Sequence, residues 1–539
     1  MTRPFLLAIA AATLLAAALR AYGVTGQVVL DDEWHAIHKL QSSWGDIATS
    51  FGWADHSIPL TLLYKAMAET IGLAEGRLRA PQFLAGVATV PLAAWIAWRA
   101  LRDAPAAALF AFLVAGAPFL VMWSRFARPY AMTPLLALAC VACVWRWRTT
   151  RGVGLAVGAA ASAALLAWLH PLCAVFPALA CLFVFLEDVA RPRGPGPRPT
   201  RSSLALGAAV AAAMALPLLP PLLADFSSLR DKAGGDQPTL ATFRWLMDVW
   251  WGGLPPAATG AACALSGWGL VVVARRAPRL AAYLAVLGLV PPLAVTLTGA
   301  LWVHSGQNFG RYVLPVQLLL LFLGAFGAID VARRLAPARA EAAAWIAATA
   351  LAMAYLAATP AIVQVATLGP WYAHIDYHWN YRYPLNEGKH ADPGSYPRPA
   401  FYREVLERAA PGTMPILEAP FNHRAPSDDL AFYATAHRQP ETFGMLHGLC
   451  GSGPREGEVP AGDRRFRFRK FVFLHDPQDV RRSGARYLVF HRRMPRASPH
   501  QNAALCLERL AGLYGPPVRL DERVAVFDLG PAPARRKLQ

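Results

Sequence analysis

Charged residues are scarce in this 539-residue chain, at 16% of positions, whereas hydrophobic residues make up 55%. That balance excludes an ordinary soluble protein and predicts a polytopic α-helical membrane protein. Acidic residues are the rarer charge, with 34 Asp and Glu against 52 Lys and Arg, and the net charge is +18. An Arg excess in a membrane protein sets its orientation and contacts anionic headgroups, so we expect membrane lipids as partners and no nucleic acid.

Several nucleotide-binding and metal-binding motifs are also missing. The chain has no GxxxxGK[ST] or GxGxxG loop, which argues against a cytoplasmic site for ATP or a nucleotide sugar. It has no CxxC or HExxH spacing, and His374 and His378 supply only two ligands at helical spacing. We therefore predict no metal site and no tightly bound cofactor, although the sequence remains compatible with a divalent cation.

The cysteines divide between two environments. Five of the seven lie in apolar runs, where a thiol behaves as a small hydrophobic group. Cys450 and Cys506 are the two in the polar C-terminal region, and an oxidising compartment would allow them to form a disulfide. The sequence leaves open whether their Cα atoms lie close enough.

Apolar runs of about 17 to 25 residues mark the membrane spans. The first run also has the composition of a signal peptide, but its long core and the lack of an A-x-A site favour a retained anchor. The run at 57–73 carries Lys65 and Glu69, and we interpret it as an amphipathic helix on the outer interface. About eleven spans are predicted, at 4–22, 80–100, 105–122, 130–147, 152–169, 171–188, 203–223, 257–274, 280–300, 312–331 and 342–365.

Arg-rich segments between these runs predict the topology, because short loops with excess Arg stay in the cytoplasm. The region after residue 366 has no run long enough to span, so it should form a soluble extracytoplasmic α/β domain. We expect a transmembrane module at 1–365, with its first outer loop at 23–79, and this domain at 366–539. The Arg-rich segments lie at 99–102, 146–151, 191–201, 275–279 and 333–339.

The C-terminal region contains further predicted elements. Short buried strands are expected at 485–489 and 524–529, and helices at 427–437 and 501–514. The aromatic segment 371–384 would either stack on sugar rings or lie at the membrane interface, and its position directly after the last span favours the interface.

The first predicted outer loop carries three successive carboxylates, Asp31, Asp32 and Glu33. A carboxylate near the headgroup layer is suited to act as a general base. Acidic residues followed by Trp and His are equally typical of a helix N-terminus. The acidic motif therefore gains weight as a catalytic candidate only from its surroundings.

Basic and aromatic residues supply those surroundings at other outer boundaries. Arg125, Arg128 and Tyr130 lie in one loop, and Arg311 and Tyr312 lie in another. Guanidinium groups bind phosphate oxygens through paired hydrogen bonds, although one of the first two Arg residues could instead snorkel to headgroups. The remaining candidates for substrate binding are His56, Arg79 and His170. The last of these ends an apolar run and would equally serve as a helix cap.

An acidic group and several cations on one membrane face suit sugar transfer from a polyprenyl phosphate. The base removes the proton of the acceptor hydroxyl, and the cations stabilise the departing lipid phosphate. The order of the motifs resembles the GT-C membrane glycosyltransferases, in the bacterial branch similar to protein O-mannosyltransferases and lipid A aminoarabinose transferases (glycosyltransferase family 39). The motifs that carry the resemblance are the acidic pair at 32–33, HSIPL at 56–60, Arg79, ARPY at 127–130 and RYVLPV at 311–316.

The resemblance covers residues 1–330 by motif and the rest by layout. It implies an inverting hexosyl- or pentosyltransferase of the bacterial inner membrane, which uses a polyprenyl-phosphate donor and an extracytoplasmic lipid, glycan or protein acceptor. It places the base at Asp32, with Glu33 beside it and Asp31 as a rival, and the lipid-phosphate contacts at Arg125, Arg128 and Arg311. Trp34 and His35 after the acidic motif, and the single Pro in HSIPL, depart from the family pattern and leave sugar and acceptor open.

Three other classes of protein fit the sequence less well. A flippase or glycan transporter would need charged residues inside its spans, which are nearly free of Asp, Glu and Lys here. An O-antigen-type ligase usually concentrates its basic chemistry in one late outer loop, whereas the acidic motif comes first in this chain. A non-enzymatic scaffold would leave the clustered acidic and basic residues unexplained.

Overall fold

The computed structural model describes residues 2–26, 29, 31–52, 57–190, 199–359, 398–421, 437–446, 449–450, 463, 465–468, 471–492 and 502–530. The chain forms two compact units. The membrane unit comprises Met1–Ala21, Ser43–Leu62 and Ala80–Val363, and the second unit comprises Tyr22–Ser42, Leu63–Arg79 and Gln364–Gln539. Both parts of the first predicted outer loop that flank residues 43–62 thus fold with the C-terminal region.

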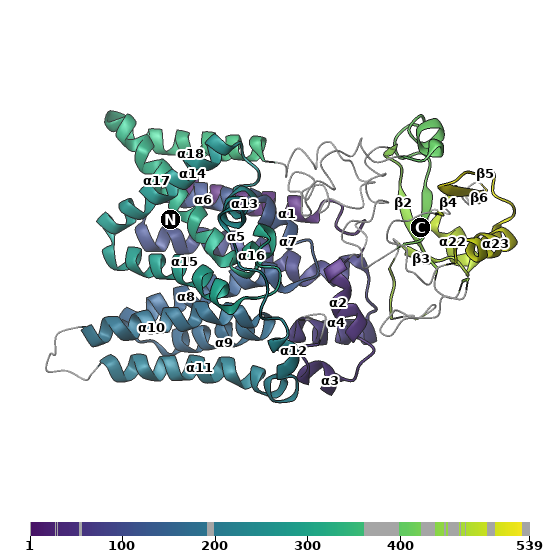
Figure 1. Ribbon diagram of the computed structural model, residues 1–539. Helices are drawn as coiled ribbons and strands as arrows, with labels where there is room; N and C mark the ends of the chain where they lie inside the picture. The colour runs from purple at the N-terminus through teal and green to yellow at the C-terminus, as the bar shows by residue number, and fades with distance from the viewer. Residues whose placement is uncertain are drawn as a thin grey trace. The chain divides into compact units, whose positions relative to one another are not determined.

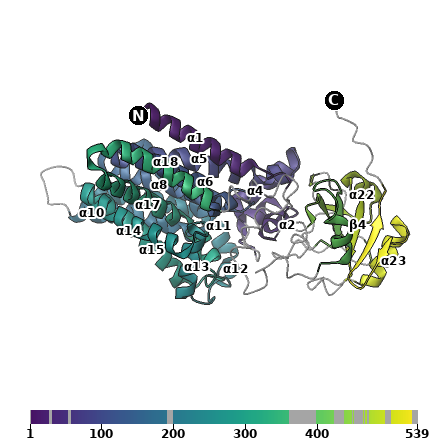
Figure 2. The same cartoon turned by 90° about the horizontal axis from the view of Figure 1, so that it is seen from above.

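Within the described residues, nine helical segments are long and apolar enough to cross a membrane, which confirms the predicted fold class. Their helices are α1 (Arg3–Ala21), α5 (Glu75–Leu101), α8 (Met132–Thr150), α10 (Val175–Ala190), α11 (Pro199–Ala224), α14 (Pro256–Arg276), α15 (Pro278–Thr298), α17 (Leu314–Leu335) and α18 (Ala340–Ala358). Two shorter apolar helices, α6 (Ala104–Gly116) and α9 (Val153–Leu169), correspond to the other two predicted spans. Figures 1 and 2 show these helices packed side by side.

The predicted span at 105–122 is broken in the structure, so that part of the prediction was wrong. Helix α6 ends at Gly116, Ala117 is extended with ψ near 115°, and α7 (Pro118–Trp123) begins after it. Proline has no amide hydrogen and disfavours a helical conformation in the residue before it. Pro118 therefore separates the two helices.

Helix α17 lies at the centre of the membrane unit, with 72% of its most apolar stretch buried. It packs closely against α14 through two glycines. A Cβ atom at Gly269 would lie 1.9 Å from the carbonyl oxygen of Leu323, and one at Gly327 would lie 2.0 Å from that of Leu265. Small residues of this kind allow two helix backbones to approach within a membrane.

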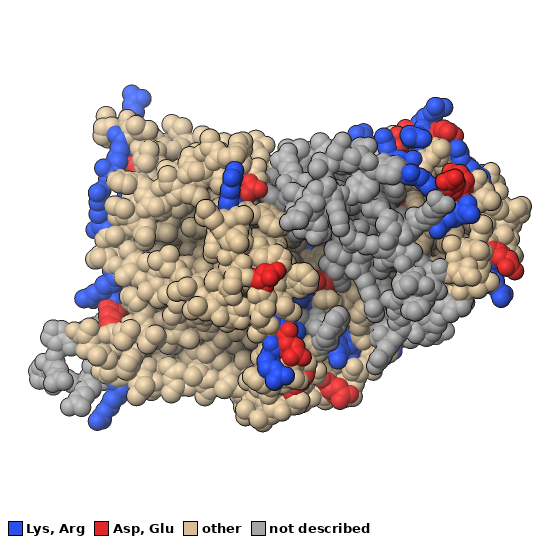
Figure 3. Space-filling model, in the orientation of Figure 1, with Lys and Arg blue, Asp and Glu red and all other residues tan. Residues whose placement is uncertain are grey.

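The Arg-rich segments meet at one end of the membrane unit. Asp103, which follows the first of them, accepts hydrogen bonds from Arg276 at 2.9 Å and from Arg333 at 2.5 and 3.0 Å. Glu187 contacts Arg148 at 2.8 Å and Arg279 at 3.5 Å. Figure 3 shows basic side chains along the left edge of this unit. The ion pairs therefore place four of the five predicted cytoplasmic segments on one face.

Several short helices lie in the connecting segments of both units. The acidic motif forms the 3₁₀-helix η1 (Asp31–Glu33), which leads into α2 (Trp34–Lys39). The predicted helix at 57–73 is present as α4 (Ile58–Thr70), which is too short to cross a membrane. The others are α3 (Trp44–Thr49), α12 (Phe226–Arg230), α13 (Leu240–Trp250) and α16 (Gly306–Tyr312).

The C-terminal region contains a six-stranded mixed sheet in the order β3-β2-β1-β4-β6-β5. The predicted strands at 485–489 and 524–529 are confirmed as β4 and β6, and the predicted helix at 501–514 as α23. The elements are β1 (Ile416–Ala419), β2 (Glu441–Met445), β3 (Phe471–Phe473), α22 (Pro477–Ser483), β4 (Tyr487–His491), α23 (Ala503–Tyr514), β5 (Arg519–Leu520) and β6 (Val524–Asp528). Most of the predicted helix at 427–437, and all of the segment 371–384, lie outside the described residues.

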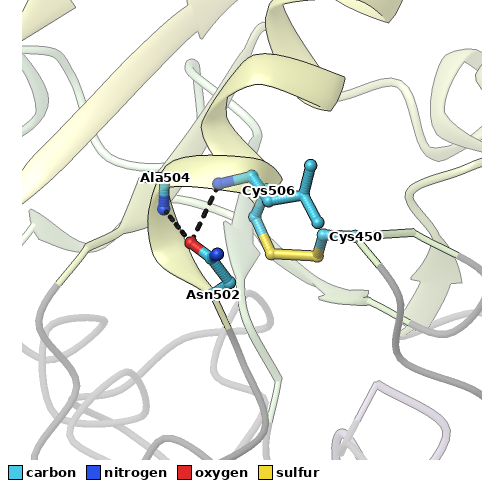
Figure 4. Close-up of a disulfide and its surroundings, with 5 residues drawn as sticks. Cys450, Asn502, Ala504 and Cys506 are labelled. Atoms are coloured by element: carbon cyan, nitrogen blue, oxygen red, sulfur yellow. Dashed lines mark hydrogen bonds between the residues drawn. A yellow bond between two sulfur atoms is a disulfide. The ribbon is translucent and has the colours of Figure 1, made fainter.

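Strand alternation gives this sheet two different faces. One face carries Leu417, Leu488 and Phe527 into an apolar core with Cys506 and Leu510 of α23. Cys450 and Cys506 form the disulfide that the sequence left open, and Asn502 caps α23 beside it by accepting hydrogen bonds from the Ala504 and Leu505 amides (Figure 4). The disulfide therefore joins this core to the chain after β2.

Candidate active site

Five of the predicted substrate-binding residues come together in the membrane unit. They are joined by Trp123, the last residue of α7, and together form what we call the Arg–aromatic cluster: Trp123, Arg128, Tyr130, His170, Arg311 and Tyr312. The cluster draws its residues from four chain segments. Local breaks in the helices place them there, since Pro129 and Pro171 begin short 3₁₀ turns after extended residues.

Both arginines of the cluster lie against the same aromatic ring. The guanidinium carbon of Arg311 is 5.1 Å from the ring centroid of Tyr130, and that of Arg128 is 5.7 Å from it. Arg311 is also 5.3 Å from the ring of Tyr312. Such cation–π contacts hold a guanidinium in place while its N–H groups remain directed at other partners.

The rings themselves pack on one another. The Tyr130 centroid lies 4.5 Å from that of Trp123 and 5.6 Å from that of His170, and His170 lies 5.3 Å from Tyr312. Arg128 is only 4% exposed and Tyr130 is fully buried, whereas Arg311 is half-buried. Two cations held on a rigid and largely dry platform favour an anion, and phosphate matches the geometry of guanidinium groups.

The Arg–aromatic cluster lies at the opposite end of its helices from the Arg-rich segments. Helix α8 begins two residues after Tyr130 and ends before Arg151, and α9 begins near that arginine and ends at His170. Helix α17 follows Tyr312 and carries Arg333 in its last turn. Since α8 has 19 residues, it is about 28 Å long, close to the thickness of a bilayer's hydrocarbon core. The two groups of arginines therefore lie about one membrane thickness apart.

Arg125 lies elsewhere than the other predicted phosphate ligands. It is fully buried, and its Nη1 donates to the carbonyl oxygens of Leu19 and Arg20 at 3.1 and 3.3 Å. Both carbonyls belong to the last turn of α1, where a helix has no backbone donors of its own. Arg125 thus acts as a side-chain cap for α1.

Two further candidates pair with each other in the second unit. Arg79 donates from Nε and Nη2 to the carboxylate of Glu33 at 2.8 and 2.6 Å, and Nη1 donates to the carbonyl of Val24 at 2.9 Å. Both side chains are 0% exposed. Because breaking a buried pair leaves an uncompensated charge, this contact holds the first outer loop in its conformation.

Asp32 differs from its neighbour in keeping access to solvent. Its side chain is 18% exposed, and its Oδ1 lies 3.8 Å from Nε2 of His35, one helical turn on. The side chain of Asp31 and the whole of His56 lie outside the described residues. Of the two described carboxylates of the acidic motif, Asp32 is therefore the one with access to solvent.

The acidic motif is anchored by residues that sequence analysis did not connect to it. The Trp34 ring lies 5.6 Å from that of Phe471 and 6.3 Å from that of Phe468. Leu73 exchanges two backbone hydrogen bonds of 2.7 Å with Arg465 and Arg467. The loop that carries Asp32 is therefore packed on the C-terminal region, a contact that no local motif records.

One described group could hold a metal by proximity alone. Ligand atoms of Glu418, His437 and Glu441 lie within 4.8 Å of one another in the C-terminal domain. Nδ1 of His437 accepts a hydrogen bond of 3.0 Å from the Gln439 amide, and its Nε2 lies 3.0 Å from Oε1 of Glu441. A metal-bound histidine instead donates from its second nitrogen. The group is better described as a buried polar network.

The same network holds the charge of Glu418. Its carboxylate accepts hydrogen bonds from Tyr402 at 2.7 Å and His491 at 3.0 Å. Burial raises the pKa of this carboxyl, but the imidazoles of His437 and His491 outweigh burial and hold the pKa below its ordinary value. These residues lie on the sheet face opposite the disulfide core, because Glu418 pairs with Val489 in β4 and that strand alternates.

Some solved structures align with nearly the whole chain. No protein-family model and no curated protein matches the sequence. The chain resembles solved structures of ArnT. ArnT from Cupriavidus metallidurans bound to undecaprenyl phosphate aligns with a TM-score of 0.49 at 15% identity, over 98% of this chain and 99% of that one. Its apo state aligns with a TM-score of 0.48 at 13% identity, over 97% of each chain.

ArnT is a GT-C membrane glycosyltransferase, the class that the sequence motifs resemble. With TM-scores below 0.5, this likeness assigns no reaction to the chain.

Proposed function

We propose that this protein transfers a sugar from a polyprenyl-phosphate donor to an acceptor hydroxyl on the extracytoplasmic side of a bacterial inner membrane. One observation carries the proposal: Arg128 and Arg311, from separate segments, converge on the ring of Tyr130. Fixed guanidinium groups in a desolvated setting favour a phosphate. Undecaprenyl phosphate, the ligand in one similar ArnT structure, is a carrier of this class.

The proposed orientation rests on the two groups of arginines. The Arg-rich segments meet at one end of the helices, and short loops with excess Arg remain in the cytoplasm. The Arg–aromatic cluster lies at the other end of α8, α9 and α17. In this proposal the donor phosphate is therefore bound at the extracytoplasmic face.

The proposed reaction is a single displacement. The acceptor hydroxyl transfers its proton to the carboxylate of Asp32 while its oxygen forms a bond to the anomeric carbon. The bond between that carbon and the phosphate oxygen breaks, and its electron pair leaves with the phosphate. Attack opposite the leaving group inverts the configuration at this carbon. Arg128 and Arg311 stabilise the phosphate anion, so no strong general acid is needed.

The other candidates receive supporting roles in this proposal. Tyr130, Tyr312 and His170 hold the two guanidinium groups through their packed rings. Arg79 and Glu33 fix the conformation of the loop that carries Asp32. Arg125 acts through the end of α1 rather than on the donor.

The experiment that tests the proposal measures two products at once. Purified protein in liposomes receives native polyprenyl lipid extract and cell-envelope acceptors, and mass spectrometry quantifies free polyprenyl phosphate and glycosylated acceptor. A transferase produces them in equal amounts. Free carrier without glycosylated acceptor would indicate a hydrolase, and movement of intact donor without either product would indicate a transporter. The same measurement on Asp32→Asn tests the base. Its matched control is Asp231→Asn, at an aspartate 70% exposed in another loop, which should retain activity.

A further inference from the structure

A buried arginine at the end of α1 lies beside the segment that contains Arg128. Arg20 is the second-last residue of the helix and is 1% exposed. A charged side chain within a membrane span is costly unless all of its donors are satisfied, so such a residue usually has a specific role. Because Arg20 lies in an apolar run, the sequence gives no sign of this role.

Arg20 satisfies the carbonyl groups that the break between α6 and α7 leaves without donors. Its Nη1 donates to the oxygen of Ala115 at 2.9 Å, and its Nη2 donates to that of Val114 at 3.5 Å. In a continuous helix Val114 would bond to the amide of residue 118, but Pro118 has none. The guanidinium of Arg20 takes the place of that backbone donor.

Arg125 makes the converse contact. It donates to the carbonyls of Leu19 and Arg20 in the last turn of α1. Arg20 thus caps the end of α6, and Arg125 caps the end of α1. These contacts hold the two chain segments together where the turn at 124–130 begins.

Ser124 and Gly86 complete this set of contacts, which together with Arg20 and Arg125 we call the joint. The Nε of Arg20 donates to Oγ of Ser124 at 3.1 Å, and that hydroxyl donates to the carbonyl of Leu120 at 2.6 Å. Helix α5 passes directly over them at Gly86. A Cβ atom there would lie 2.1 Å from Oγ of Ser124 and 2.9 Å from Nε of Arg20. Only glycine leaves room for the joint.

We propose that Arg20 is a positioning residue for the donor phosphate: with Ser124 and Arg125 it fixes the start of the turn that brings Arg128 to Tyr130. The inference rests on the proposed function for the identity of the anion. Arg20 itself does not touch the donor and acts through the turn. Its loss should therefore weaken donor binding while leaving the step at Asp32 unaffected.

Three substitutions perturb the joint in different ways. Arg20→Met keeps an unbranched side chain but removes the guanidinium with its charge and hydrogen bonds, and Arg20→Lys keeps the charge and only part of the bonding. Gly86→Ala pushes on Ser124 from the other side. We expect Arg20→Met and Gly86→Ala to raise the KM for the donor about tenfold with kcat within about twofold, which is a change in ground-state binding. Arg20→Lys should lie between them and the wild type.

Matched controls are available for each change. Arg99→Met replaces an exposed arginine at the end of α5, and Gly207→Ala places a methyl group in open space on α11. Both should retain the wild-type KM. If Arg20 had only a structural role, Arg20→Met would lower thermal stability but would not raise the KM for the donor while leaving kcat unchanged.

The closing experiment combines undecaprenyl phosphate binding with hydrogen exchange of residues 117–131, on full-length protein that elutes as a folded species. Faster exchange and about tenfold weaker binding in Arg20→Met and Gly86→Ala, but in neither control, is the expected result. Unchanged binding in both variants would overturn the inference, whatever their stability. If the wild type binds no undecaprenyl phosphate although exchange responds to Arg20→Met, the proposed function fails, and Arg20 is reduced to a structural cap.

Discussion

Arg79 and Glu33 form a fully enclosed ion pair with two hydrogen bonds, at 2.8 and 2.6 Å, across 46 residues of sequence. The carboxylate of Glu33 is thus buried and bonded to Arg79. Its neighbour, Asp32, lies in the same loop and keeps partial access to solvent.

The ion pair yields a stability prediction. Glu33→Gln should lower the free energy of unfolding by about 3 to 5 kcal/mol, because it leaves the buried guanidinium uncompensated. The double variant Glu33→Leu/Arg79→Met should recover a large part of that loss, since no charge is then buried. Thermal unfolding of the detergent-solubilised variants measures both values. A double variant no more stable than Glu33→Gln would contradict this explanation.

Donor binding should depend on the planar shape of the Arg311 guanidinium as well as on its charge. Arg311→Ala should weaken donor binding by at least about tenfold, and Arg311→Lys should not restore it, because an ammonium lacks the planar group that stacks on Tyr130 and Tyr312. Titration with undecaprenyl phosphate measures the affinity. Arg230→Ala, at a position 72% exposed, is the control. Full recovery with lysine would show that charge alone suffices.

Asp103 should stabilise the opposite end of the helices without affecting chemistry. Burial raises the pKa of its carboxyl, but hydrogen bonds from Arg333 and Arg276 outweigh burial and hold the pKa below 3.8. Its contribution is therefore fully present above pH 3.8 and is lost only as the pH falls through the lower, folded-state value.

Accordingly, Asp103→Asn should lower stability at neutral pH by about 1 to 3 kcal/mol. The activity that remains at saturating donor, measured per folded molecule, should match the wild type. A loss of turnover in folded Asp103→Asn would indicate coupling between the two membrane faces, which this structure does not require.

The disulfide between Cys450 and Cys506 closes a loop with a sequence separation of 56 residues. Restricting a loop of that length in the unfolded chain stabilises the folded state by about 4 kcal/mol in the chain-entropy description. Cys506→Ser should therefore lower the unfolding temperature of the C-terminal domain. Limited proteolysis on heating, with and without reductant, measures the change. Equal sensitivity of wild type and variant in the absence of reductant would contradict it.

Sequence patterns predicted most of the membrane unit, because apolar runs and Arg-rich loops are local signals. They also brought Arg128, Tyr130, Arg311 and Tyr312 into one group, since each flanks the same end of an apolar run. The break at Pro118 could not be predicted from a proline alone, because α11 and α15 continue through internal prolines.

Other relationships have no local signal. Glu33 and Arg79 belong to different segments, and neither periodicity nor spacing identifies them as partners. Arg20 lies within an apolar run that reads as an ordinary anchor, and its role depends on carbonyl groups about 95 residues away. The packing of Trp34 on Phe471 similarly joins the first loop to the C-terminal region. Such contacts depend on tertiary structure, and composition cannot reveal them.

The role of Asp32 is tested most directly by comparing wild type and Asp32→Asn in one preparation. Undecaprenyl phosphate binding and the release of free polyprenyl phosphate from native donor are measured together. The substitution keeps the size of the side chain and removes the base. We expect unchanged binding and a release of polyprenyl phosphate reduced by at least about a thousandfold, within the range expected for a lost general base. Wild-type release by Asp32→Asn would contradict the assignment of Asp32 as the base.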